Sequence, residues 1–119
     1  MLVCCGQHTY VNLEKVDVQR LPDGRARVTA TVDCEQVSSR RCTGGLADYC
    51  IVVEWTGAAA STDRACVKST LAVRDARQIV DVVSSAAPPA SGARATVTLV
   101  TPTGGQVGGR GSPTTVDVP

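Results

Sequence analysis

The alternation of apolar and polar positions is clearest between residues 26 and 34. Every second residue from Ala26 to Cys34 is apolar, and the residues between them are charged or threonine. A period of two places successive side chains on opposite faces of a β-strand. This segment therefore predicts a strand with one buried face and one face in water.

The preceding segment, Val11–Val18, shows the same alternation with one interruption. Its apolar phase shifts by one position between Leu13 and Val16. Such a shift would turn half of the strand outward unless an extra residue is accommodated, so we predict a β-bulge near Glu14–Lys15. Between the two strands lies Leu21-Pro22-Asp23-Gly24-Arg25, in which Pro presets φ and Gly accepts a positive φ. We predict a hairpin turn there.

The rest of the chain consists of short apolar segments separated by turn residues. Tyr49–Trp55 is a nearly continuous apolar run, which is typical of a central strand. Thr56–Arg64 is rich in Gly, Ala and Ser and predicts a loop or one short helical turn. Further strands are predicted at Cys66–Val73, Gln78–Val83, Ala93–Val100 and, as a short last element, Thr115–Val118.

Six or seven strands at this spacing predict an all-β fold, a single antiparallel β-sandwich of immunoglobulin-like architecture with extended termini. Nineteen Val and thirteen Thr, which are β-branched, agree with it. The spacing of Cys34, Trp55 and Cys66 does not match a true immunoglobulin domain, so the likeness is one of architecture alone. We expect an N-terminal arm (residues 1–9), the sandwich domain (10–100) and a Gly/Pro-rich C-terminal tail (101–119).

Charge and hydropathy narrow the range of partners. The net charge of +1 creates no field that would attract nucleic acid, and 3% aromatic residues leave no stacking platform for single strands. The longest apolar runs, such as Met1–Cys5 and Cys50–Val53, are too short to span a membrane. We therefore expect protein partners, namely other subunits of an assembly, with no nucleic acid and no membrane span.

Six cysteines in 119 residues are more than a cytosolic domain normally carries without a metal or catalytic reason. If Ile51 and Val67 face the core, Cys50 and Cys66 lie on the outer face of neighbouring strands and can pair. Cys34 and Cys42 can close the loop between their strands, whereas adjacent Cys4 and Cys5 should pair elsewhere. The disulfide candidates, which allow fifteen connectivities, are thus Cys4, Cys5, Cys34, Cys42, Cys50 and Cys66.

Candidate chemistry beyond disulfides is sparse. Cys4-Cys5-x-x-His8 is the one cluster that suggests a metal or thiol-redox module, but the tight C-x2–4-C knuckles of structural zinc sites are absent from the sequence. A single histidine near the terminus argues against a Cys–His nucleophile pair. No hydrolase, zincin or nucleotide-binding fingerprint occurs. We expect no catalytic residue, no metal site and no cofactor.

These features favour a non-enzymatic structural or interaction domain that works outside the cytosol. The cysteines indicate an oxidising compartment, whereas the residues after Met1 show no signal-peptide pattern. This combination fits either a mature secreted domain to which Met1 was added or a protein that is made in the cytosol and works outside the cell, as virion proteins do. Ten Arg against two Lys is typical of GC-rich genomes, so we expect most concretely a phage virion surface or tail component. The alternatives are a secreted inhibitor or binding module that uses the loop of residues 35–48, and a Cys/His metal or thiol-redox module.

The terminal segments are candidate assembly elements. Met1–Cys5 is apolar, and Thr114–Pro119 is rich in β-branched residues and follows a Gly-rich tether. Such a tail can reach the sheet edge of a neighbouring chain, where strand addition would cover that edge. It can equally fold back on its own domain, and the sequence leaves both arrangements open.

Overall fold

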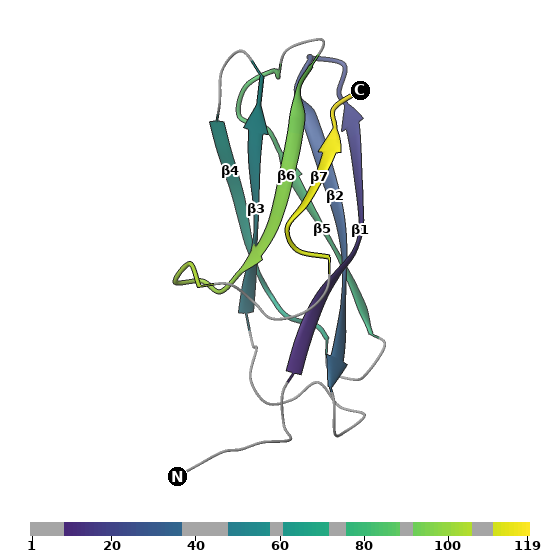
Figure 1. The fold of residues 1–119 in the computed structure, drawn as a ribbon, viewed down its shortest axis with the longest axis vertical. Helices are drawn as coiled ribbons and strands as arrows, with labels where there is room; N and C mark the ends of the chain where they lie inside the picture. Colours follow the sequence, from purple (N-terminus) through teal and green to yellow (C-terminus); the bar gives the residue numbers. More distant parts are fainter. Residues whose placement is uncertain (1–8, 37–47, 58–60, 72–75, 89–91, 106–110) are drawn as a thin grey trace.

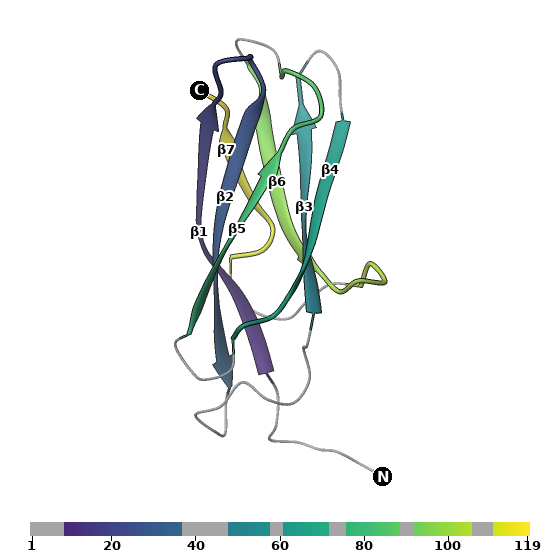
Figure 2. The ribbon, with the colours of Figure 1, turned by 180° about the vertical axis from the view of Figure 1, so that it is seen from behind.

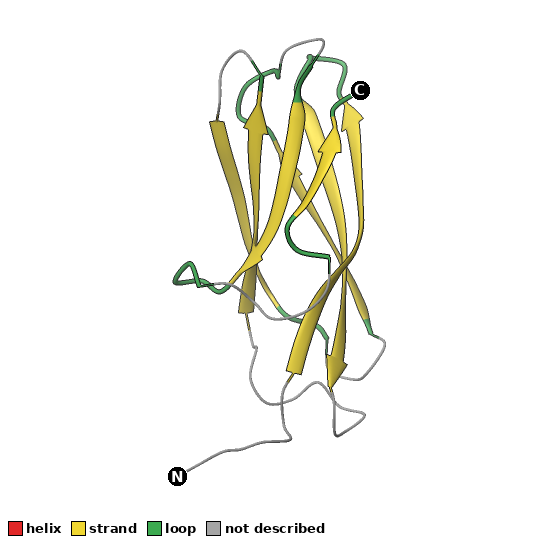
Figure 3. Cartoon of the chain, in the orientation of Figure 1, coloured by secondary structure: helices red, strands yellow, loops and turns green. Residues whose placement is uncertain are grey.

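A computed structural model describes residues 9–36, 48–57, 61–71, 76–88, 92–105 and 111–119 of the chain. These residues form two antiparallel β-sheets that pack face to face (Figures 1 and 2). None of the described residues is in a helix (Figure 3). The seven-stranded, all-β sandwich predicted from the sequence is confirmed.

The first sheet has the strand order β1-β2-β5. β1 (Thr9–Arg20) and β2 (Ala26–Gln36) form the predicted hairpin, and β5 (Arg77–Val83) pairs antiparallel with the other side of β2. β2 is therefore the central strand, and β1 and β5 are the two edges.

The hairpin turn and the bulge both lie where the sequence places them. In the turn, the Gly24 N–H donates to the Leu21 carbonyl at 2.9 Å, and Gly24 has a φ of +89°, which favours glycine. The pairing of β1 with β2 shifts its register between Leu13 and Lys15. The bulge keeps the residues on both sides of it in phase with the core.

The second sheet has the order β4-β3-β6-β7. In immunoglobulin constant domains the fourth strand belongs to the sheet of the first two, whereas here β4 pairs with β3 in the second sheet. The architecture is thus immunoglobulin-like with its fourth strand in the opposite sheet. The strands are β3 (Asp48–Thr56), β4 (Ser61–Lys68), β6 (Arg94–Val100) and β7 (Thr114–Asp117).

The core lies between the sheets and consists mainly of valine, alanine and leucine. The predicted inward phase of β2 is confirmed, since Val28, Ala30 and Val32 are buried completely. Trp55 is the largest side chain in the core, and its indole N–H donates to Asp63 at 2.8 Å. This bond satisfies the one polar group of the buried ring.

One prediction from the sequence needs correction. β4 begins at Ser61, inside the segment Thr56–Arg64 that predicted a loop or helical turn. Asp63 occupies a half-buried position in β4 because it accepts the indole hydrogen bond, and this polar residue hides the alternation. The short last strand expected at Thr115–Val118 is present as β7, and it pairs with β6 of its own domain. The tail therefore folds back, which is the second of the two arrangements left open.

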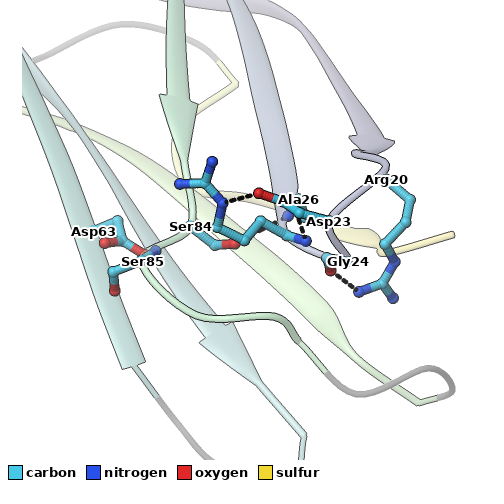
Figure 4. A network of polar contacts seen from close by, with 8 residues as sticks. Arg20, Asp23, Gly24, Ala26, Asp63, Ser84 and Ser85 are labelled. Atoms are coloured by element: carbon cyan, nitrogen blue, oxygen red, sulfur yellow. Dashed lines mark hydrogen bonds and ion pairs between the residues drawn. The ribbon is translucent and has the colours of Figure 1, made fainter.

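The two long sides of the sandwich are joined differently. On one side β7 lies next to β1, and the Arg20 guanidinium donates to the Pro119 carbonyl at 3.1 Å and to the Pro88 carbonyl at 2.8 Å. It also donates to the Gly24 carbonyl at 2.9 Å (Figure 4). On the other side β4 lies next to β5, where the Ser85 N–H donates to Asp63 at 3.1 Å. Each edge strand therefore lies next to an edge strand of the other sheet.

Candidate interaction surface at the β5 edge

The predicted pairing of Cys50 with Cys66 is confirmed. The two residues are direct cross-strand partners in β3 and β4, and they form a disulfide with a Cα–Cα distance of 4.0 Å. The bond lies on the outer face of the second sheet, where Cys50 is buried and Cys66 is exposed. It joins an edge strand to its neighbour within one sheet, unlike the inter-sheet disulfide of antibody domains.

The remaining cysteine candidates are only partly described. Cys34 is also disulfide-bonded, and none of the three cysteines in the described part of the chain is free. Cys4, Cys5, Cys42 and His8 lie outside the described residues, as do residues 37–47 of the loop considered for an inhibitor. Where the chain is described, no three His, Cys, Asp or Glu side chains gather in a way that could hold a metal ion.

Three of the four sheet edges carry features that discourage pairing with another strand. β1 is interrupted by its bulge, and β7 has only four residues. β4 carries Arg64 and Lys68 on its exposed face, and the Arg64 guanidinium lies 3.2 Å from the Cys66 sulfur. Bulges, short strands and cations are devices by which proteins protect sheet edges.

β5 has no bulge, and its exposed phase carries charges of opposite sign, Arg77 and Asp81, rather than cations alone. Its seven residues pair with β2 without any shift of register. Its outer face carries Ile79 and Val83, which are 68% and 38% exposed and are the large hydrophobic side chains that the described residues expose to solvent. A straight, apolar, exposed edge strand is a template for pairing with another chain.

The backbone of β5 presents hydrogen-bonding groups along this edge. The Ser84 N–H donates to the Ala26 carbonyl at 2.8 Å, so the groups of Ser84 face β2. In an antiparallel ladder this orientation alternates, and the N–H and C=O groups of Ile79, Asp81 and Val83 face away from β2. Because β5 ends its sheet, these groups have no strand partner in the described structure.

Charged side chains flank the apolar residues of this edge. The Arg77 guanidinium reaches across β2 to Glu14, with distances of 2.8 Å and 3.1 Å to its two carboxylate oxygens. This hydrogen bond lowers the pKa of Glu14 below its ordinary value. Asp81 accepts a hydrogen bond from the Thr29 hydroxyl at 2.8 Å. The edge thus has a cation at its start, a carboxylate four residues later and Ile79 between them.

The sequence reasoning identified the strand at Gln78–Val83 but not its exposed side chains. The inward residues Val80 and Val82 alternate with Ile79 and Val83, so both phases of the segment are apolar. The only sequence signal for the outward phase is the pair of charges at Arg77 and Asp81. This signal is too weak to predict from one strand which apolar residues face the core and which face solvent.

Comparisons with protein-family models, with curated proteins and with solved structures find no match to this chain. Among the described residues, no helix is long and apolar enough to cross a membrane.

Proposed function

We propose that this chain is a non-enzymatic structural and interaction domain of an extracellular assembly, most concretely a surface or tail component of a phage virion. The observation that carries the proposal is the β5 edge, where unpaired backbone groups and exposed Ile79 lie on one straight strand. Disulfides at Cys50–Cys66 and at Cys34 support work in an oxidising environment.

The distribution of edge features supports an interaction role. A strand that only needed protection would carry a bulge or like charges, as β1 and β4 do. β5 instead carries 68% exposed Ile79 on a continuous register. An apolar residue kept on an open edge is consistent with a surface that another strand covers.

Sedimentation velocity of the oxidised chain over a rising concentration series tests the assembly role. We expect species heavier than the monomer, and their fraction should increase with concentration. Ile79→Lys on the β5 edge should reduce this association. The matched control, Val52→Lys on the outer face of β3 and away from every edge, should not. A wild-type chain that stays monomeric at every concentration would contradict the proposal and favour a monovalent inhibitor or binding module.

A second measurement separates the proposal from the metal or thiol-redox module. Thiol titration of the denatured, unreduced protein should find no reactive thiols, and a reductant should lower the melting temperature by many degrees while a chelator does nothing. The disulfide closing the 16-residue separation between Cys50 and Cys66 is worth about 3 kcal/mol by its loop length. Four or more reactive thiols, or unfolding by the chelator alone, would favour the module instead.

A further inference from the structure

We infer that the partner of the β5 edge is a second copy of this chain, bound antiparallel about a two-fold axis that passes at Ile79. This inference rests on the proposed function and names its partner. It joins the two three-stranded sheets, edge to edge, into one continuous sheet.

The backbone limits which residues can face each other. Only groups that point away from β2 can bond to a second strand, and these belong to Ile79, Asp81 and Val83, in phase with the outer side chains. Two antiparallel copies must therefore match residues of this phase with residues of the same phase. The side chains brought together are the exposed ones.

Charge selects one register among those that remain. When Ile79 lies opposite Ile79 of the second copy, Arg77 lies opposite Asp81, and the two-fold axis repeats this contact. A register that sets Ile79 against Asp81 buries an apolar side chain beside a carboxylate, and one centred on Asp81 brings two carboxylates together. Opposite charges across a strand pair are favourable and like charges are unfavourable.

β4 shows the reverse pattern at the same spacing. Its exposed phase carries Arg64, Cys66 and Lys68, so antiparallel pairing of two copies about Cys66 would set Arg64 against Lys68. This self-pairing opposes like charges, whereas the pairing of β5 opposes unlike ones. The difference points to β5 rather than β4 as the self-associating edge.

The Arg77 side chain is already directed along the sheet by its own Glu14. Because the bidentate contact already restricts the rotamers of Arg77, association costs less side-chain entropy at this residue. In the pair, Arg77 lies between Glu14 of its own chain and Asp81 of the second copy, and Asp81 keeps the Thr29 hydroxyl as a donor.

Charge reversal tests this register in the full, oxidised chain. Arg77→Asp and Asp81→Arg should each raise the dissociation constant of the self-associated species by roughly tenfold or more, because each replaces two opposite-charge pairs by like-charge pairs. Mixing the two variants should restore association as a heterodimer. The matched control is the pair Lys15→Asp and Asp17→Lys on the outer face of β1, for which neither single change nor mixing should alter association.

A cysteine at the axis provides a test that does not depend on charge. Residues in a hydrogen-bonded antiparallel pair have Cα atoms about 5.5 Å apart, which suits a disulfide. Ile79→Cys should therefore give an intermolecular disulfide on air oxidation, seen as a doubled mass without reductant. Val83→Cys, also exposed on β5, should give much less because it does not face itself in this register.

The outcomes separate this inference from the proposed function. Self-association that neither charge reversal nor Ile79→Cys affects would overturn the inference and leave the assembly role standing. Loss of association in both charge variants without restoration in the mixture, with both variants folded by circular dichroism, would overturn the register. A wild-type chain that is monomeric throughout would overturn both. If Arg77→Asp fails to fold, the comparison of Ile79→Cys with Val83→Cys decides alone.

Discussion

β1 and β5 border the same three-stranded sheet, but their edges are finished in opposite ways. β1 is bulged between Leu13 and Lys15 and has β7 of the other sheet beside it, with Arg20 bonded to the carbonyl of Pro119. β5 is straight and exposes Ile79. Both strands pair with β2 and pack on the same core, so they differ only in the bulge, the exposed side chains and the contacts of each edge.

The contacts that join the two sheets also differ between the side of β1 and the side of β5. The C-terminal strand closes the side of β1, and therefore it is not available to a neighbouring molecule in this arrangement. On the side of β5, the link to the other sheet runs through inward groups: Gln78 accepts from the Tyr49 hydroxyl at 2.7 Å and donates to the Lys68 carbonyl at 3.0 Å. These contacts attach β5 to the second sheet, and Ile79 on its outer face remains 68% exposed.

The largest expected effect is the loss of the three-stranded sheet, and with it both β1 and β5. Val28 is buried completely in β2, between β1 and β5, so Val28→Asp places an unpaired carboxylate in the core at a cost of several kcal/mol. We expect loss of cooperative urea unfolding, measured by circular dichroism. Gln19→Glu is the control because Gln19 is exposed and accepts a hydrogen bond from Arg27, for which Glu offers an acceptor oxygen on a side chain of the same length. A cooperatively folded Val28→Asp variant would contradict the assigned face of β2.

A smaller effect on the free energy of unfolding is expected where Gly111 lies against β1. Gly111 has a φ of +82°, and a methyl group there would overlap the carbonyl oxygen of Leu13 at the bulge of β1. Gly111→Ala should cost about 2–4 kcal/mol in the free energy of unfolding, measured with urea. Gly92→Ala, at a φ of +75° with open space around it, should cost about 1 kcal/mol. Equal costs would show that the approach to Leu13 does not matter.

Arg20 tests the contacts that join β1 to the C-terminal residues and to the carbonyls of Gly24 and Pro88. Arg20→Met removes its hydrogen bonds to the carbonyls of Gly24, Pro88 and Pro119, and we expect a loss of about 1–2 kcal/mol. Hydrogen exchange should quicken at the Val118 N–H, which donates to the Ala93 carbonyl at 3.0 Å.

The control for this change is Arg25→Met in the hairpin turn, whose guanidinium pairs with the exposed Asp23. It should leave exchange at Val118 unchanged. Self-association through β5 should survive Arg20→Met, since the residue lies on the opposite side of the sheet. Weakened association in this variant would mean that the two edges are coupled.

The smallest effect at neutral pH is expected at the hydrogen bond from the Tyr49 hydroxyl to Gln78, which attaches β5 to β3. Burial raises the pKa of the Tyr49 hydroxyl to about 12 from 10.0 because it disfavours the phenolate. The folded state keeps a proton that the unfolded chain releases, so this contribution is complete below pH 10 and is lost as the pH rises through about 12. Unfolding free energies measured across this range should fall less steeply in Tyr49→Phe. Identical slopes in both proteins would contradict the assignment.

Most of the fold could be predicted from the sequence. The alternation of Ala26–Cys34, the phase shift after Leu13 and the Pro-Asp-Gly turn each depend on local backbone geometry, so each could be predicted from neighbouring residues. The pairing of Cys50 with Cys66 followed from the same reasoning, because period two fixes which side chains share a face.

The features of the sheet edges depend on contacts between residues far apart in the sequence and could not be predicted from it. Asp63 can face inward because the indole of Trp55 meets it from the next strand, and β7 returns to β6 although its sequence fits a neighbour's sheet equally well. Ile79 and Val80 are both apolar, and their different exposure depends on where the second sheet packs. Burial is a property of non-local contacts, so a strand that is apolar in both phases has no inside until those contacts form.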